Sequence, residues 1–386
     1  MQRVGGVDVA RGLAILGMFT AHLGDADGAR LWNGASWLEA ADGRSAAMFA
    51  LLAGVSAGFI SGGAEMTPEW EAAPHRMRHA RVRILVRAAV LLPLGILLAV
   101  LGTRIAVILP SYAIMFAMLT VALAWRPRRL LLAAGVVLLV APPVVYLARD
   151  GLPYPGPVGY PMDLLVGEYY PALVWVAYLL VGLALARLDL TSTAMPRGLL
   201  LWGPPLAVLG YGVGAVAVRT VPEEHTLRRA LLDASPHADS AVEVVGNVGV
   251  VLCVLAVCLV LASRAPAWCY PVAATGALAL TAYTVQIVVI AWLGDDVFIR
   301  PSNLRLAAFV VVTLAVATLW RRALGRGPLE AALHSASTRM ADRLAPRASP
   351  LGEGLAPRAS PLADGDRSGL PPDDPPSGEE RTSQPR

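Results

Sequence analysis

Long apolar runs alternate with short polar segments over residues 1–334. A helix needs roughly 17–25 mainly apolar residues to cross the hydrocarbon core of a bilayer. The pattern therefore predicts an all-α fold, a polytopic membrane helix bundle of about ten transmembrane helices. The expected spans are residues 7–23, 44–62, 84–101, 105–125, 130–148, 170–187, 198–218, 242–263, 271–293 and 304–321.

Arginines mark one side of the predicted bundle. The sequence contains no lysine, and its arginines cluster within residues 76–87, 126–129, 187–197 and 321–326. Basic residues are enriched in the cytoplasmic loops of membrane proteins. With about ten spans and the N-terminus inside, all of these clusters fall on the cytoplasmic side. We therefore expect an N-in/C-in orientation.

Composition supports the membrane class and narrows the chemistry. Apolar residues make up 56% of the chain and charged residues 16%, whereas soluble domains are roughly 25% charged. The formal net charge of +4 comes from arginines at membrane boundaries, so no nucleic-acid partner is expected. The sequence lacks a phosphate-binding glycine loop, a GxSxG elbow and an HExxH pair, which disfavours hydrolases and nucleotide-driven pumps. No metal site is predicted.

The last fifty or so residues differ in character from the rest. The segment LAPRASPLGEG at 344–354 is followed by LAPRASPLADG at 355–365, and the remainder is rich in Pro, Ser and Gly. Such a composition cannot bury a hydrophobic core. We therefore divide the chain into a membrane domain, residues 1–334, and a disordered cytoplasmic tail, residues 335–386.

Ionisable side chains inside membrane spans are costly, so they are candidates for function. Asp8, Arg11 and His22 belong to the first span. Eleven positions separate Arg11 from His22, which places them on nearly one helix face about 16 Å apart. Asp8 precedes Arg11 by one turn and could pair with it. The alternative is an interfacial arginine with its counter-ion and a histidine on the loop side.

Polar clusters also open two later spans on the predicted outer side. Asp42 and Arg44, with Ser45, precede an apolar run; they could cap the helix or bind a ligand. In a second cluster, His237 lies in a loop, and Glu243 and Asn247 share a helix face at four-residue spacing. The alternative for Glu243 and Asn247 is a hydrogen-bonded contact between helices.

A third polar group, Thr281, Tyr283 and Gln286, lies within the predicted span 271–293. Hydrogen bonding between helices is the commonest explanation for such residues in a membrane span. The three cysteines, Cys253, Cys258 and Cys269, have no metal-ligand or disulfide spacing and are interpreted as small buried apolar residues.

The N-terminal stretch RVGGVDVARGLAILGMFTAH resembles the start of the transmembrane acyltransferase superfamily. That superfamily includes the heparan-α-glucosaminide N-acetyltransferase family and the type-three membrane acyltransferases. The resemblance rests on an acidic residue, then Arg-Gly, then an apolar helix that ends in histidine; here these are Asp8, Arg11, Gly12 and His22.

Further pieces resemble a bacterial branch of the same superfamily. They are scattered over residues 3–334 and read GRSAAMFALLAGVS, ILVRAAVLLPLGILL, ILPSYAIMF, GALALTAYTVQI and RGPLEAALH. One departure matters for chemistry. The heparan enzyme carries its catalytic histidine in a His-Ala-Ser-Trp stretch, and this chain reads Gly34-Ala35-Ser36-Trp37. Either His22 or His237 takes over that role, or the chain performs different chemistry.

The resemblance implies a multi-pass acyltransferase of the plasma membrane of a bacterium. It would move an acyl group such as acetyl from a cytoplasmic acyl-CoA to an envelope glycan or lipid-linked acceptor at the outer face. We expect His22 or His237 as catalytic base and Asp8, Arg11, Asp42, Arg44, Glu243 and Asn247 in substrate binding. The expected partners are the lipid bilayer, acyl-CoA as co-substrate and the acceptor, with no bound cofactor.

Two other functions stay open. The charged residues could line a conduit, which would make the chain a transporter or flippase of a small envelope precursor. A non-catalytic envelope sensor or scaffold is the third possibility. An acyltransferase consumes its donor, whereas a transporter releases its substrate unmodified, so the two differ in a measurable product.

Overall fold

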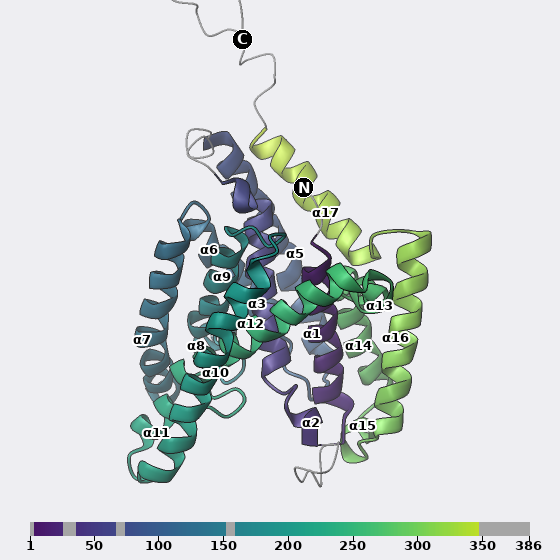
Figure 1. Ribbon diagram of the computed structural model, residues 1–386. Helices are drawn as coiled ribbons and strands as arrows, with labels where there is room; N and C mark the ends of the chain where they lie inside the picture. Colours follow the sequence, from purple (N-terminus) through teal and green to yellow (C-terminus); the bar gives the residue numbers. More distant parts are fainter. Residues whose placement is uncertain (1–3, 26–35, 67–73, 152–158, 347–386) are drawn as a thin grey trace, which may run out of the picture. The chain divides into compact units, whose positions relative to one another are not determined.

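The computed structural model describes residues 4–25, 36–66, 74–151 and 159–346, and all regular structure in these ranges is helical (Figure 1). The predicted all-α fold is confirmed. The helices are α1 (Gly5–Leu23), α2 (Ser36–Glu39), α3 (Arg44–Ile60), the 3₁₀ turn η1 (Gly63–Glu65), α5 (Pro74–Val100), α6 (Leu109–Ala122), α7 (Pro127–Gly151), α8 (Gly159–Val166), α9 (Ala172–Ala186), α10 (Met195–Thr220), α11 (Thr226–Leu232), α12 (Ala241–Arg264), α13 (Pro266–Ala277), α14 (Ala279–Leu293), α15 (Asp296–Ile299), α16 (Asn303–Ala323) and α17 (Pro328–Leu344).

Five of these helices, namely α5, α7, α10, α12 and α16, are each long and apolar enough to cross a membrane. Helices α13 and α14 together form a sixth candidate span, although they are bent by 70° at the break between them. Large apolar side chains on the long helices, such as Leu139 and Leu201, are exposed, which suits contact with lipid. The chain is an integral, multi-pass membrane protein.

Every range predicted to span the membrane falls on a helix or, for 271–293, on the broken pair. The remaining ranges correspond to α1, α3, α6 and α9. Helices α3, α6 and α9 have 17, 14 and 15 residues. Helix α9 is apolar on all sides and almost wholly buried, as expected for the centre of a bundle. That these four helices also cross the bilayer, giving ten spans, stays a prediction.

Glycines allow the central helices to approach closely. A Cβ atom added to Gly54 on α3 would lie 2.2 Å from the carbonyl oxygen of Leu179 on α9, and one on Gly182 would lie 1.9 Å from that of Leu51. A Cβ atom on Gly276 of α13 would lie 1.9 Å from the carbonyl oxygen of Asp8 on α1. Small residues at such crossings replace side-chain packing with backbone contact, which is common between membrane helices.

One arginine joins the ends of three helices. Arg187, directly after α9, donates from Nη1 to the carbonyl oxygens of Gly58, Ser61 and Gly63, each at 3.2 Å. Its Nη2 donates to Ser61 Oγ at 2.8 Å and to the carbonyl oxygen of Leu123 at 2.6 Å. The acceptors lie at the C-terminal ends of α3 and α6, and Arg187 itself follows α9. One cation therefore lies at the negative ends of three helix dipoles.

The last helix, α17, packs along α5. His79 Nε2 lies 2.9 Å from Asp342 Oδ1, and Arg78 donates to the carbonyl oxygen of Leu344 at 2.8 Å. Ser337 and Ala341 are fully buried against this surface. The boundary expected between residues 334 and 335 therefore falls inside a helix, because α17 is amphipathic and buries one face. Residues 347–386, the rest of the predicted tail, lie outside the described residues.

Candidate active site

The loop before α12 is held in an unusual conformation by the first turn of that helix. Ser240 is the N-cap residue, and its Oγ accepts a hydrogen bond from Glu243 N at 3.0 Å. The Glu243 carboxylate in turn accepts from the backbone N–H of His237 at 3.0 Å and of Asp239 at 2.7 Å. His237 and Asp239 have φ of 63° and 55°, which is rare for residues other than glycine and clusters at functional sites.

This loop brings His237 to Asp42, which lies two residues before the start of α3. His237 Nε2 lies 3.6 Å from Asp42 Oδ1, and the ring packs in parallel orientation against Trp175, with centroids 6.4 Å apart. Burial lowers the pKa of His237, but the charge and hydrogen bonding of Asp42 outweigh it, so its pKa is raised overall. The His237 interaction lowers the pKa of Asp42. His237 Nδ1 is buried and lacks a hydrogen-bond partner among the described residues.

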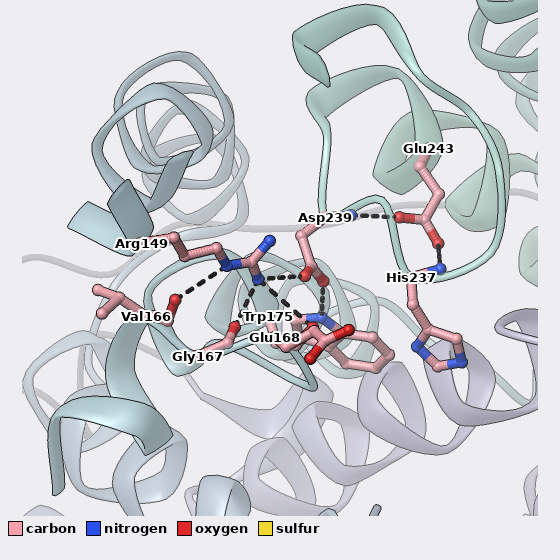
Figure 2. A network of polar contacts seen from close by, with 8 residues as sticks. All are labelled: Arg149, Val166, Gly167, Glu168, Trp175, His237, Asp239 and Glu243. Atoms are coloured by element: carbon pink, nitrogen blue, oxygen red, sulfur yellow. Dashed lines mark hydrogen bonds and ion pairs between the residues drawn. The ribbon is translucent and has the colours of Figure 1, made fainter. Parts of the chain in front are cut away.

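A second charge pair anchors the other side of the loop (Figure 2). Asp239 accepts from Arg149 Nη2 at 2.8 Å and from Trp175 Nε1 at 2.7 Å. Arg149, near the end of α7, also donates to the carbonyl oxygens of Val166, Gly167 and Glu168. Burial raises the pKa of Asp239, and the bonds from Trp175 and Arg149 oppose that rise. The loop is thus fixed to α7 and α9, with the His237 ring placed beside Trp175.

A chain of hydrogen bonds links Glu243 to the start of α3. Asn247 Nδ2 donates to Glu243 Oε1 at 3.3 Å and to Tyr178 OH at 2.9 Å. Tyr211 OH donates to Asn247 Oδ1 at 2.6 Å and accepts from Arg44 Nε at 2.9 Å. The predicted shared face of Glu243 and Asn247 is confirmed, and the pair also makes the helix–helix contact named as its alternative. The guanidinium group of Arg44 is held by its hydrogen bond to Tyr211 OH and by its contact with the Tyr211 ring.

His22, at the end of α1, lies near the same pair. The ring is electrostatically coupled to both Asp42 and His237. Gln286 on α14 is fully buried, and its Nε2 donates to His22 Nδ1 at 2.8 Å. In this orientation of the amide, the proton of a neutral His22 ring lies on Nε2. His22 is therefore arranged as a donor, whereas His237 has a free ring nitrogen.

Asp8 and Arg11 lie toward the other end of α1. Arg11 Nη1 donates to Asp8 Oδ1 at 3.0 Å, and Nη2 donates to Ser56 Oγ at 2.9 Å, so the predicted Asp8–Arg11 pair is confirmed. Arg11 borders a cavity of about 180 Å³. Arg87 and Tyr112 border it as well, and Arg87 Nε and Tyr112 OH are buried without a partner among the described residues. Polar atoms of this kind are suited to a polar ligand.

The break between α13 and α14 borders the same cavity. Arg11 Nη1 lies 3.5 Å from the carbonyl oxygen of Gly276, near the end of α13. Glu330 of α17 accepts from Thr281 N at 3.0 Å and from Thr281 Oγ1 at 2.7 Å, in the first turn of α14. A cation thus meets the negative end of one half-helix and a carboxylate meets the positive end of the other. Tyr283 OH accepts from the backbone N–H of Ile108 at 3.3 Å, so the interhelical bonding predicted for Thr281, Tyr283 and Gln286 is confirmed.

Comparison with known protein families assigns the chain to a family. The family model described as Heparan-alpha-glucosaminide N-acetyltransferase, catalytic, matches residues 3–211, more than half of the chain. The chain belongs to this family. A second model, Protein of unknown function (DUF418), matches residues 197–339. No curated protein and no solved structure matches the chain. The superfamily resemblance inferred from the sequence is confirmed.

In this member of the heparan-alpha-glucosaminide N-acetyltransferase family, both matched regions build the histidine cluster. The first region supplies His22, Asp42 and Arg44, and the second supplies Glu243 and the rest of the loop. The structure thus gathers most of the predicted site residues at one place and leaves Asp8 and Arg11 at another. In the stretch Gly34-Ala35-Ser36-Trp37, residues 34 and 35 lie outside the described residues, as do the side chains of 36 and 37.

Several site residues of this family member were not predicted from the sequence. Asp239, Arg149 and Trp175 fix the loop, and Glu330 caps α14. The spacing of Ser240 and Glu243 is that of a capping box, which could have marked the loop as ordered. Arg149 and Trp175 carry no such signal, because an arginine and a tryptophan near helix ends are ordinary in membrane proteins.

The Asp42–His237 pair predicts a pH dependence of stability in this family member. The stabilisation from His237 is complete below its unfolded pKa of 6.5 and is lost as pH rises through its higher folded value. The stabilisation from Asp42 is complete above its unfolded pKa of 3.8 and is lost as pH falls through its lower pKa in the folded protein. Stability should therefore peak between these limits. Resistance to thermal inactivation, measured against pH, should decline above pH 6.5 in the native protein and decline less in Asp42→Asn. Identical profiles would contradict the pairing.

Proposed function

We propose that this chain is an integral membrane acyltransferase. It moves an acyl group such as acetyl from a cytoplasmic acyl-CoA to an envelope glycan or lipid-linked acceptor, at the outer face of the plasma membrane of a bacterium. The observation that carries the proposal is the Asp42–His237 pair, with its free Nδ1 and with His22 nearby, in a chain of an N-acetyltransferase family. A histidine oriented by a carboxylate is a common catalytic base.

The geometry favours His237 over His22 as the base. Asp42 lies at His237 Nε2, which leaves the Nδ1 lone pair to accept a proton. His22 Nδ1 already accepts from Gln286, so its Nε2–H is suited to donate to a developing oxyanion. Glu243 and Asn247 position the His237 loop. Arg44, at the start of α3, would bind an acidic group of the acceptor. Tyr169, half exposed beside His237, offers an aromatic surface to the acceptor.

Arg11 and its cavity fit the donor. Arg11 and Arg87 bring two guanidinium groups to one cavity, where phosphate groups of acyl-CoA would be bound in a forked geometry. Asp8 orients Arg11. Arg11 and His22 lie about 16 Å apart along α1, a separation that the long pantetheine arm of CoA can bridge. Tyr112 OH provides a further polar contact along that path.

The proposed step is a direct acyl transfer. The acceptor amine or hydroxyl attacks the thioester carbonyl carbon, its proton passes to His237 Nδ1, and His22 Nε2–H stabilises the oxyanion. The carbon–sulfur bond then breaks, CoA leaves as the thiolate, and the proton held by His237 neutralises it. The products are the acylated acceptor and free CoA.

The proposal is tested with full-length protein in proteoliposomes supplied with acetyl-CoA and an extract of envelope lipids and glycans. We expect release of free CoA thiol that depends on both protein and acceptor, and a matching gain of one acetyl group in an acceptor detected by mass spectrometry. Transfer of an unmodified acceptor across the membrane, without CoA release, would instead support a transporter.

We also propose the full topology of ten spans with both ends of the membrane domain in the cytoplasm. Its support is the arginine distribution, since the ends of α7 and α16 that carry Arg128 and Arg322 would both face inward. Single cysteines placed beside Arg128 and Arg322 in a cysteine-free background should react only with reagent added inside. One placed at His225 should react only from outside. Labelling beside Arg128 from outside would overturn this topology.

The broken pair α13–α14 favours a transporter as the second candidate. Discontinuous helices whose ends border a cavity form the substrate sites of many secondary transporters. Here the 70° bend, the Gly276 carbonyl group and the Arg11 guanidinium border one cavity. The product measurement described above separates the two functions, because only an acyltransferase releases CoA.

A further inference from the structure

A deep apolar groove lies between α7 and α10, away from the histidine cluster and from the Arg11 cavity. Its volume is about 890 Å³, within the roughly 300–1,000 Å³ typical of small-molecule sites. Leu131 and Leu138 of α7 form one wall, Trp202 and Leu206 of α10 form the other, and the floor is formed by α9 and α12. The groove therefore cuts through the outer layer of helices down to the buried α9.

Glycines open this groove. A Cβ atom added to Gly135 of α7 or to Gly198 of α10 would meet nothing within 4 Å, although both residues line the groove. Glycines at the helix crossings behave differently: a Cβ atom on Gly203 of the same helix would lie 2.6 Å from Cys253 Sγ. Gly135 and Gly198 thus widen an open space and do not serve close helix packing.

Cations flank one end of the groove. Arg128 and Arg129 belong to the first turn of α7, and Arg197 to the first turn of α10; all three are exposed. Across the described ranges, none of the three has an ion-pair partner. Asp189 also lines this end, but its carboxylate already accepts hydrogen bonds from Thr191 N at 2.9 Å and Thr191 Oγ1 at 2.6 Å.

The helix ends add to this positive potential. The N-terminal ends of α7 and α10 are the positive ends of their helix dipoles, so they add to the charge of Arg128, Arg129 and Arg197, and an anion there would be stabilised. The groove is thus apolar along its length and cationic at one end.

We propose that this groove binds one anionic glycerophospholipid of the surrounding bilayer. Its acyl chains lie along the Leu131 and Trp202 walls, and its phosphate group meets Arg128, Arg129 and Arg197. Basic sites between membrane helices recognise anionic lipid head groups in this way. The groove complements the apolar acyl chains and the anionic phosphate group of this lipid. That distinguishes it from the annular lipids that surround any apolar helix.

The test is native mass spectrometry of the delipidated full-length protein in detergent, titrated with phosphatidylglycerol and, separately, with phosphatidylcholine. We expect one phosphatidylglycerol to bind preferentially. The double variant Arg128→Gln/Arg129→Gln should weaken that binding by about thirtyfold, toward the level of phosphatidylcholine. The matched control, Arg321→Gln/Arg322→Gln, removes a basic pair from the end of α16 and should leave the affinity for phosphatidylglycerol unchanged. Equal affinity for the two lipids in the native protein would overturn the anionic site.

A second pair of variants tests the groove itself. Gly135→Phe and Gly198→Phe each fill open space on a different wall, so each should fold and lose the bound phosphatidylglycerol. Gly212→Phe is the matched control, because Gly212 is also open, lies on α10 and lines a different groove. Retained lipid in both groove variants, with native thermal stability, would show an annular lipid only and overturn the proposal.

Discussion

His237→Asn should slow acyl transfer by about 10²–10⁴-fold, the usual contribution of a general base. Asparagine tolerates the left-handed backbone that His237 adopts at φ 63°, so the loop should keep its conformation while losing the titratable ring. Donor binding should be retained, because the Arg11 cavity is built from other helices. The measurement is CoA release at saturating acetyl-CoA, together with donor affinity.

The matched control for this variant is His225→Asn, which changes an exposed histidine in the same segment between α10 and α12. It should leave turnover unchanged. Asp42→Asn should shift the acidic limb of the rate profile to lower pH, because Asp42 raises the pKa of His237 and the base must be unprotonated. Full activity in His237→Asn, with activity lost in His22→Gln, would move the base to α1.

Arg187→Leu should destabilise the bundle by about 3–5 kcal/mol, since it removes a partly buried cation and leaves its acceptors unpaired. The carbonyl oxygens of Gly58, Gly63 and Leu123 lose their shared donor. Arg187→Lys should rescue only part of this loss, because a single ammonium group cannot reach the acceptors at the ends of both α3 and α6. The measurement is the fraction of monodisperse protein that survives heating in detergent.

Arg264→Leu is the control for Arg187. Arg264 is an exposed arginine at the end of α12, and its replacement should change stability by no more than about 0.5 kcal/mol. Native heat resistance in Arg187→Leu would show that the acceptors find other donors, and the joining role assigned to Arg187 would be wrong.

Hydropathy located the helices because each apolar window must form a helix to satisfy its own backbone in lipid. It could not locate the break in the span 271–293, because the ends of α13 and α14 are stabilised by Arg11 and Glu330, both distant in sequence. The structural role of Arg187 could not be predicted from the sequence either. In the sequence it is one more arginine after an apolar run, and its acceptors belong to two other segments, residues 58–63 and Leu123.

The candidate site was predictable in its parts but not in its assembly. Histidine and acidic residues near helix ends marked His22, Asp42 and His237 individually. Their meeting depends on the loop conformation at Asp239, which rests on Arg149 of α7 and Trp175 of α9. Spacing along α1 likewise grouped His22 with Arg11, whereas the structure assigns each to a different set of neighbours.

The packing of α1 has a consequence for the order of synthesis. Helix α1 leaves the ribosome well before α12, α13 and α16, on which it packs, and Arg11 reaches a residue 265 positions later. Until α13 is made, the Gly12 surface that will contact Val272 has no cover. The Asp8–Arg11 pair, closed within one helical turn, neutralises both charges of α1 during that interval. Nascent chains released before α13 would expose this surface to membrane quality control.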